Sequence, residues 1–582
     1  MDQSTIAWIA FGVYLVVTAG LAIIGYLKTD SLESFAVGKR DMGPWLVGIT
    51  MGAAMSSTAT FVINPGFVYA HGLSAFVHLG VAVGLGIAVA LAVLSPTFRR
   101  VGVDGHALTL PHWIGTRYQS TALRVIFGVI SLMSIAFLVL IAGSVQILLQ
   151  KTLGLSADNA LLLTIGFVFS YILIGGTYAH TYTNSLQGVM MVFVTVAILT
   201  KTVGALSTDG FWALLEARDA NLLATVNPDS VLYGDIFSVY VAGFVIGFAV
   251  VCQPHLLMKA LYLEKDEDVG KYVMVSVGIT FIFFTLLLGG LAAHAVLDPA
   301  ASEVARQDAV MVAWLKTQFG EVSFVLISVA LVAAGMSTLD GILVAMSTVV
   351  SNDVYLPIAS RTFLSQHSAE QQQLAGYRFG QVVLILMGVV TYLFLVKEPD
   401  PVLGLLGELG WIGVVIGLAL PVAAAFTAPK SAMRPRIITG AVVLGTLLVA
   451  CGTILGLEAR PPKLLGIFGQ TGVYGIIAAA VGPILIGVLM PRRRDLRPLA
   501  LTISVVGFLF YVLLNSIRFM VSNPAYADTG LAQSWVGFAE SSPALAGTLA
   551  HANPAVPATL SIMLSALIAV IWLAAHANPE KN

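Results

Sequence analysis

Residues 322–350 read VSFVLISVALVAAGMSTLDGILVAMSTVV, an apolar run long enough to cross a bilayer, with a polar cluster in its middle. The cluster holds Ser337, Thr338 and Asp340. Hydroxyls and a carboxylate at membrane depth are costly, and they are retained where they bind something. The small residues before them, such as Gly335, let another helix or an ion approach the backbone closely. This segment therefore predicts a functional site inside a membrane helix.

The composition indicates a polytopic membrane protein. Of 582 residues, 58% are hydrophobic and only 10% are charged, whereas soluble domains carry about 25% charged residues. The net charge of −1 gives no reason to expect a nucleic-acid partner. The two cysteines, Cys252 and Cys451, lie far apart in apolar segments and form no disulfide or zinc pattern. Metalloprotease and serine-hydrolase motifs are absent from the sequence, so we expect neither an enzyme nor an organic cofactor.

A membrane helix needs about 20 apolar residues, and that criterion predicts about fifteen spans. They are 5–27, 43–65, 72–96, 121–150, 159–177, 183–207, 235–258, 270–297, 321–350, 376–396, 404–427, 436–457, 471–490, 497–520 and 556–576. The first is too long for a signal peptide and precedes no small-residue cleavage site, so we interpret it as a retained helix.

Lysines and arginines are concentrated in alternate loops, which predicts the orientation. The rich set comprises Lys28, Lys39, Arg40, Arg99, Arg100, Arg117, Lys259, Lys265, Arg361, Lys430, Arg434, Arg436, Arg492, Arg493, Arg494 and Arg497. The opposite set is Lys151, Arg218, Arg306, Lys316, Arg460 and Lys463. We expect the rich loops in the cytoplasm, the N-terminus outside, the C-terminus inside, and the chain in the cytoplasmic (inner) membrane.

Two further spans are unusual. Residues 50–66 combine five hydroxyls with an Asn64-Pro65-Gly66 breaker, and 235–258 contain two glycines and end in Gln253-Pro254-His255. A broken helix at 50–66 would expose carbonyls able to bind a cation. A Ser/Thr-rich packing interface at 50–66 and a plain kink in 235–258 are the alternatives from these residues alone.

Several segments together resemble the sodium/solute symporter family, in particular its pantothenate and monocarboxylate branches. They are Ala36–Pro44, the Ser/Thr-rich second span with Pro65-Gly66, Leu110–Tyr118, Gly175–Gln187, Gln253-Pro254-His255, and Met336-Ser337-Thr338 followed by Ser351–Tyr355. The resemblance implies an all-α fold with the 5+5 inverted repeat of the bacterial leucine transporter (LeuT). It divides the chain into an extra helix at 1–42, a first repeat at 43–207, a loop at 208–234, a second repeat at 235–427 and additional helices at 428–582. The first helix of each repeat is expected to be discontinuous.

The same resemblance implies a sodium site. Its ligands would be the carbonyls of Ala53, Ser56 and Ala334 and the hydroxyls of Ser337 and Thr338. No other cofactor is implied.

One position departs from the family pattern. Where other members carry an aspartate, this chain has Asn184, and a carboxylate occurs instead at Asp340. We interpret the pair as a second ion or proton site, with a trait of one branch that has no ion role as the alternative.

Solute-binding residues are expected on the broken helix and on two other spans. They are Ser57, Thr58, Thr60, Phe61, Ser144, Gln146, Tyr240 and Phe244.

The function expected is sodium-coupled import of a small organic solute, a carboxylate, by alternating access. The expected partners are thus the solute, Na⁺ and the bilayer. The alternatives are a proton-coupled symporter of the same fold and a transporter-like membrane sensor, and a small membrane partner or self-association is left open.

Overall fold

The protein is described by a computed structural model that is helical throughout. It describes residues 3–298, 307–396, 470–491, 493, 495–522 and 530–576, with 445, 448 and 452. Within these ranges the only extended pairing is an isolated bridge between Met42 and Leu263. Two compact units are present, residues 1–396 and 397–582, and the expected spans 404–427 and 436–457 lie outside the described residues but for three positions.

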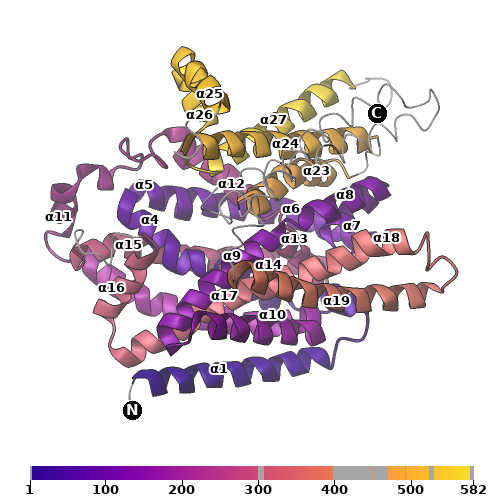
Figure 1. Ribbon diagram of the computed structural model, residues 1–582, viewed down its shortest axis with the longest axis horizontal. Helices are drawn as coiled ribbons and strands as arrows, with labels where there is room; N and C mark the ends of the chain where they lie inside the picture. The colour runs from indigo at the N-terminus through magenta and orange to yellow at the C-terminus, as the bar shows by residue number, and fades with distance from the viewer. Residues whose placement is uncertain are drawn as a thin grey trace. The chain divides into compact units, whose positions relative to one another are not determined.

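Figure 1 shows the course of the helices. The first unit contains α1 (Gln3–Tyr26), α2 (Leu32–Val37), α3 (Pro44–Met55), α4 (Asn64–His71), α5 (Leu73–Phe76), α6 (Val83–Asp104), α7 (Leu110–Arg117), α8 (Thr121–Ser131), α9 (Ser134–Leu153), α10 (Ala157–Leu206), α11 (Phe211–Arg218), α12 (Ala242–Val250), α13 (Pro254–Leu257), α14 (Val269–Thr285), α15 (Gly289–Ala292), α16 (Val310–Gln318), α17 (Glu321–Val349), α18 (Leu356–Ala359) and α19 (Ala369–Val396). The second contains α23 (Ile476–Leu489), α24 (Arg497–Ser522), α25 (Gly530–Ser541), α26 (Pro543–Leu549) and α27 (Ala555–Ala575).

Short 3₁₀ and π-helical turns join or extend these helices. They are η1 (Gly38–Arg40), η2 (Ala59–Ile63), η3 (Val77–Ala82), η4 (Ala220–Leu223), η5 (Phe237–Val241), η6 (Met258–Tyr262), η7 (Asp266–Asp268), η8 (Leu286–Leu288), η9 (Ala293–Ala295), η11 (Gln307–Ala309), η12 (Val350–Tyr355) and η13 (Thr471–Gly475).

Among the described residues, nine helices are long and apolar enough to span a bilayer, and two bent pairs raise the number to eleven. This confirms a polytopic all-α membrane protein, although the expected number of fifteen is not reached within these ranges. The expected span 121–150 occurs as two shorter helices, α8 and α9, separated at Leu132 and Met133.

The expected spans 159–177 and 183–207 are not separate helices in the structure, and the polar segment 175–187 lies where they meet. The chain instead forms one element, α10, whose helical geometry is interrupted only at Gly176, with φ of 49°. Glycine adopts this φ without steric cost, and a Cβ here would lie 2.5 Å from the Phe35 ring. The polar side chains after Gly176 are therefore held on a helix, where the backbone groups bond to each other.

The two helices expected to be discontinuous are both interrupted. The α3 helix starts at Pro44 and ends before Ser56, and its axis is bent by 57° from that of Thr60–His71. The second break lies between α12 and α13, where Pro254 starts the new helix after a bend of 59°. Proline suits a first helical turn because its missing N–H has no intrahelical partner there.

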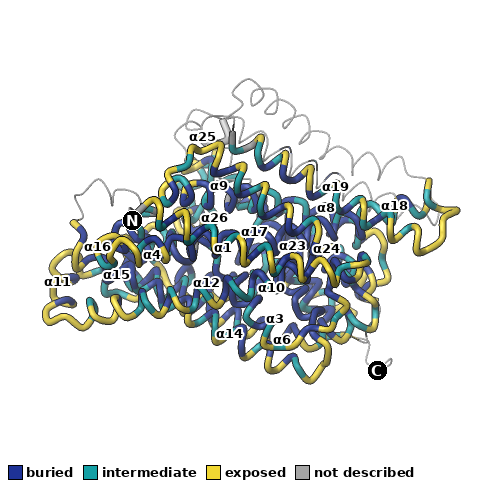
Figure 2. Tube along the Cα trace, turned by 90° about the horizontal axis from the view of Figure 1, so that it is seen from below, coloured by how far each residue is buried: buried dark blue, intermediate teal, exposed yellow. Residues whose placement is uncertain are grey.

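Helix α17 lies at the centre of the first unit. It packs against α1, α3, α9, α10, α13 and α19. From Ile327 to Val349 every residue is buried, including the hydroxyls and Asp340, as Figure 2 shows for the interior around α17. By contrast α1 exposes apolar side chains such as Val16 and Ile23, which suits an outer helix facing lipid.

Helices α6 and α12 meet backbone to backbone through reciprocal glycines. A Cβ on Gly86 would collide with the carbonyl oxygen of Phe244, and one on Gly247 would collide with the carbonyl oxygen of Val83. Only glycine permits this approach, and such contacts are typical of tightly packed membrane helices. The two helices belong to different halves of the expected repeat.

In the second unit α24 packs against α23 and α27. Gly507 lies against the carbonyl of Ala478, and Arg518 donates to the carbonyl oxygen of Ala552 at 2.9 Å.

Candidate ion and solute site

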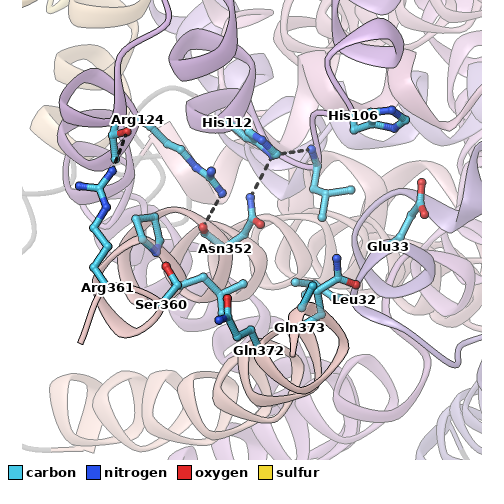
Figure 3. Close-up of a pocket in the computed structure, with 15 residues that line it drawn as sticks. Leu32, Glu33, His106, His112, Arg124, Asn352, Ser360, Arg361, Gln372 and Gln373 are labelled. Carbon is cyan, nitrogen blue, oxygen red and sulfur yellow. Dashed lines mark hydrogen bonds between the residues drawn. The ribbon is translucent and has the colours of Figure 1, made fainter. Parts of the chain in front are cut away.

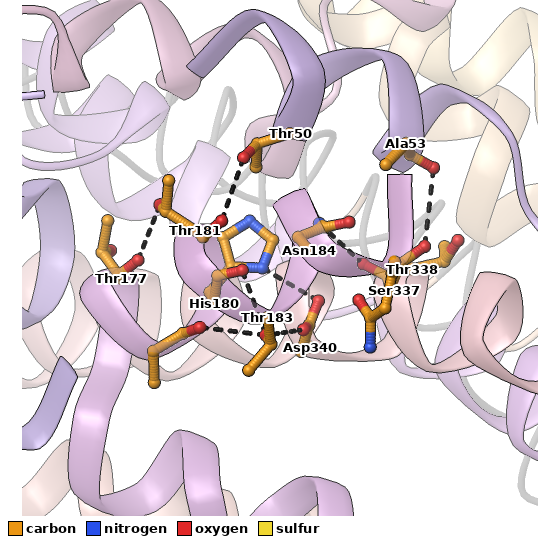
Figure 4. Close-up of polar contacts among 12 residues, drawn as sticks. Thr50, Ala53, Thr177, His180, Thr181, Thr183, Asn184, Ser337, Thr338 and Asp340 are labelled. Atoms are coloured by element: carbon orange, nitrogen blue, oxygen red, sulfur yellow. Dashed lines mark hydrogen bonds and ion pairs between the residues drawn. The ribbon is translucent and has the colours of Figure 1, made fainter. Parts of the chain in front are cut away.

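The hydroxyl pair on α17 faces the broken end of α3. The Ser337 hydroxyl donates to the carbonyl oxygen of Ala334 at 2.7 Å and lies 3.5 Å from that of Ala53, while the Thr338 hydroxyl lies 3.5 Å from the Ala334 oxygen. Figure 4 shows Ala53 and Ser337 pointing toward one another across the two helices. Four of the five expected sodium ligands are thus together in one buried group, the oxygen cluster (Ala53, Ala334, Ser337 and Thr338).

Ser56, the fifth expected ligand, is the residue at which α3 ends. Its N–H donates to the carbonyl oxygen of Ala53 at 3.2 Å, so it lies beside the cluster. The hydroxyls of Ser56 and Thr58 are buried and have no hydrogen-bond partner among the described atoms. Buried hydroxyls normally find partners, so unpartnered oxygens beside a break in a helix indicate a place for a cation.

Gly335 brings α17 close to the broken helix. A Cβ at this position would lie 2.6 Å from the Thr58 hydroxyl and would collide with the side chain of Val145. The small residue in the sequence thus permits the close approach that the cluster requires.

Asn184 on α10 forms a third side of this region. Its amide nitrogen donates to the carbonyl oxygen of Ser337 at 3.2 Å, and its own carbonyl oxygen is buried without a partner among the described residues. Another oxygen therefore lies next to the hydroxyl pair.

Asp340 is held by three groups on α10. Its carboxylate accepts hydrogen bonds from the hydroxyls of Tyr171 at 3.1 Å and Thr183 at 3.2 Å, and it lies 2.9 Å from Nδ1 of His180. Asp340 and Asn184 are thus near one another along the same pair of helices but bond to different atoms. Their joint role as an ion or proton site stays a prediction.

His180 and Lys259 have positions in the structure that the sequence did not predict. Lys259 was expected in a cytoplasmic loop, but it lies fully buried on η6 with its ammonium 2.6 Å from Nε2 of His180. From sequence alone, a lysine at the end of an apolar run can be either in a loop outside the membrane or buried in the protein interior.

The expected solute-binding residues fall into two groups. Thr58, Thr60 and Phe61 are buried on the broken helix next to the cluster, where the Phe61 ring lies 5.6 Å from that of Phe283, and Ser57 is partly buried beside them. The remainder lie on other elements.

Of this second group, Gln146 donates to the carbonyl oxygen of Ala157 at 3.0 Å and so joins α9 to the start of α10. Ser144 is on α9, and Tyr240 and Phe244 are exposed on η5 and α12. Their contribution to solute binding stays a prediction.

A separate polar pocket of about 560 Å³ lies elsewhere and contains none of the expected site residues. Figure 3 shows Arg124 beside Asn352, to whose carbonyl oxygen it donates at 2.6 Å. Arg124 also donates to the buried Asp353 at 2.7 Å. Burial and the positive charge of Arg124 lower the pKa of the His112 imidazole in this pocket to about 3. His112 is therefore neutral at physiological pH.

Comparison with known proteins agrees with this architecture. The chain is 24% identical to the sodium/pantothenate symporter of Haemophilus influenzae over 81% of its length and 94% of the relative. It is 25% identical to the sodium/proline symporter of Escherichia coli over 81% of its length and 93% of the relative. The structure of a Na⁺-coupled sialic acid symporter, bound to substrate and open to the outside, aligns with a TM-score of 0.57 and 16% identity. It covers 80% of this chain and all of that one.

These likenesses establish an all-helical transporter fold of the LeuT type in a multi-pass membrane protein. The model of the sodium:solute symporter family matches residues 35–424, well over half of the 582 residues. The chain therefore belongs to the sodium:solute symporter family.

Proposed function

We propose that the protein is a sodium-coupled symporter that imports a small organic carboxylate by alternating access. The observation that carries the proposal is the oxygen cluster, in which the Ser337 hydroxyl lies 3.5 Å from the carbonyl oxygen of Ala53 on a broken helix. The names of the sodium-coupled relatives support the choice of ion.

Sodium is a hard cation that prefers oxygen ligands, and interrupted helices supply them in transporters. In this protein the ligands would be carbonyls of α3 and α17 with the hydroxyls of Ser337 and Thr338. Since these groups carry no formal charge, binding is weak enough to be reversible, as a coupling ion requires.

Coupling follows from the position of the cluster between two helices. An ion bound to both α3 and α17 holds them together and favours the arrangement in which the solute residues on the broken helix are in place. The ion is released when the helices part. Only such a difference in affinity between two states can link the sodium gradient to solute movement.

The solute is assigned as a carboxylate on two grounds. Named relatives carry proline and pantothenate, and both compounds contain a carboxylate group. The helix that restarts after the break in α3 offers the positive end of its dipole, next to Thr58 and Thr60.

The proposed location is the cytoplasmic (inner) membrane, with the N-terminus outside and the C-terminus inside. Lys28, Lys39 and Arg40 follow α1, and Arg99 and Arg100 lie in the last third of α6, which supports a cytoplasmic location for these ends under the positive-inside rule.

The decisive experiment is uptake into proteoliposomes. Purified protein is tested with a panel of radiolabelled carboxylates and amino acids, with an inward sodium gradient and with potassium in its place, at one fixed pH. We expect accumulation of at least one carboxylate only with sodium. Equal uptake without sodium contradicts sodium coupling, and a proton gradient that drives uptake alone identifies the proton-coupled alternative.

A further inference from the structure

Three connected ionisable side chains lie in the interior beside the oxygen cluster, and the proposed function does not use all of them. Lys259 on η6, His180 on α10 and Asp340 on α17 have exposures of 0%. The Lys259 ammonium lies 2.6 Å from Nε2 of His180, and Nδ1 of His180 lies 2.9 Å from the Asp340 carboxylate. We call these three residues the buried triad.

The chemistry of lysine fixes the direction of both hydrogen bonds. With Lys259 in its charged form, its ammonium has three donors and no acceptor, so Nε2 of His180 accepts from it. The ring proton of a neutral imidazole then lies on Nδ1, which donates to Asp340. The triad thus consists of one cation and one anion joined by a neutral imidazole, with no net charge.

Among the described residues, the surroundings of Asp340 supply hydrogen bonds but no second cation. Tyr171 and Thr183 donate hydroxyl protons to the carboxylate, and the phenols of Tyr14 and Tyr262 are close enough to feel its charge. Phenols carry no charge at neutral pH. Because an unmatched buried charge is strongly unfavourable, the ammonium of Lys259 is the group that balances Asp340.

The buried triad adjoins the oxygen cluster on both of its helices. Asp340 follows Thr338 by two residues on α17. His180 precedes Asn184 by one helical turn on α10, and Asn184 donates to the carbonyl oxygen of Ser337. The charge balance of the triad therefore acts directly on any ion bound at the cluster.

We propose that Lys259 is a tethered counter-ion of Asp340, relayed through His180, that takes the place of a second cation from solution. The protein accordingly binds one sodium ion per chain, at the oxygen cluster. This inference rests on the proposed sodium binding and adds its stoichiometry and the residue that determines it.

The test is direct binding of ²²Na⁺ to the purified full-length protein, measured by scintillation proximity at one mildly acidic pH, so that the amine of Lys259 keeps its proton while Asp340 stays ionised. The native protein should bind one sodium ion per chain with simple saturation. Lys259→Met removes the ammonium and leaves the Asp340 charge unmatched. We expect this variant to recruit a second ion, so that the count rises to two.

Two further variants complete a double-mutant cycle of Lys259 and Asp340. Asp340→Asn leaves the Lys259 charge unmatched, and its repulsion should weaken sodium binding about tenfold or more, because a buried unit charge acts over several ångströms. The double variant Lys259→Met with Asp340→Asn is neutral again, and it should bind one sodium ion with near-native affinity. Lys259→Arg keeps the charge and should also bind one.

Asp353→Asn is the matched control. Asp353 is also fully buried and pairs with a cation, Arg124, but it lies away from the cluster, so the sodium count and affinity should not change. Should Lys259→Met fail to fold, recovery of folded protein in the double variant supports the proposal, and no recovery contradicts it.

Two results overturn the inference while leaving sodium coupling intact. The first is that the native protein binds two sodium ions. The second is that Lys259→Met binds one sodium ion and the double variant binds sodium no more tightly than Asp340→Asn. A native protein that binds no sodium refutes the proposed function itself.

Discussion

At the scale of single residues, the proposed ion site depends on the hydroxyls of Ser337 and Thr338, which both lie next to the carbonyl oxygen of Ala334. Ser337 donates to Ala334 and approaches Ala53, so its oxygen can face an ion while its proton remains bonded to its own helix. A hydroxyl arranged in this way is satisfied in both the occupied and the empty site, which keeps the helix intact when the ion leaves.

We predict that Ser337→Ala together with Thr338→Ala raises the sodium concentration for half-maximal uptake about tenfold or more. Each lost oxygen removes about 1 kcal/mol of interaction, and 1.4 kcal/mol corresponds to a factor of ten. The measurement is sodium activation of solute uptake in proteoliposomes. Ser328→Ala is the control, because its hydroxyl bonds within the same helix to Phe324 at 2.9 Å. An unchanged sodium curve in the double variant contradicts the site.

The residues of the cluster could be predicted from sequence because hydroxyls in an apolar run stand out and the family resemblance aligns them. The partners of Asp340 could not. His180 lies 160 residues from Asp340, and Lys259 lies 79 residues from His180, so only the fold brings them together. Lys259 follows an apolar run, as a lysine in a loop often does. The sequence therefore predicted a loop position, whereas the structure buries this residue.

At the scale of elements, the interruptions in helices were the most predictable feature. Proline and glycine mark both broken helices, hydroxyl residues mark the first, and the structure bends at each by more than 50°. The polar segment of α10 was harder to predict. Its threonines are polar, but Thr181 bonds back to the carbonyl oxygen of Thr177 on its own helix and remains helical.

The contact between α17 and the broken helix yields a second prediction. Gly335→Ala places a methyl group against Val145 and the Thr58 hydroxyl, which forces the two elements apart. We expect a loss of about 1–3 kcal/mol in stability from overpacking. We also expect weaker sodium activation, since the cluster spans this contact.

The measurements for this variant are the melting temperature and the sodium activation curve. Gly320→Ala is the matched control, because Gly320 precedes the same helix and an added Cβ there meets no atom within 4 Å. If Gly335→Ala behaves like Gly320→Ala, the close approach has no part in ion binding.

At the scale of the whole molecule, a sodium site between two helices should stabilise the folded protein. At a sodium concentration 100 times the dissociation constant, the gain is about 2.7 kcal/mol. We predict that the melting temperature of the detergent-solubilised protein rises with NaCl but not with KCl at equal ionic strength. The rise should disappear in the Ser337→Ala, Thr338→Ala variant. Equal stabilisation by both salts contradicts a specific site.

The orientation gives a fourth prediction. In a background with Cys252 and Cys451 replaced by serine, a single cysteine at Asp209 should react with an impermeant maleimide on intact cells. A single cysteine at Ser365 should react only after the membrane is opened. Both residues are exposed in the structure, so access depends on the side of the membrane alone. The reverse pattern shows that the N-terminus lies inside.

The reciprocal glycines of α6 and α12 have a mechanical consequence. At Gly86 and Gly247, carbonyls of one helix lie against the α-carbon of the other, so neither position has a side chain that could change rotamer. We therefore expect α6 and α12 to move together as one rigid unit. The helices that open the solute pathway to either side of the membrane would then move relative to this unit.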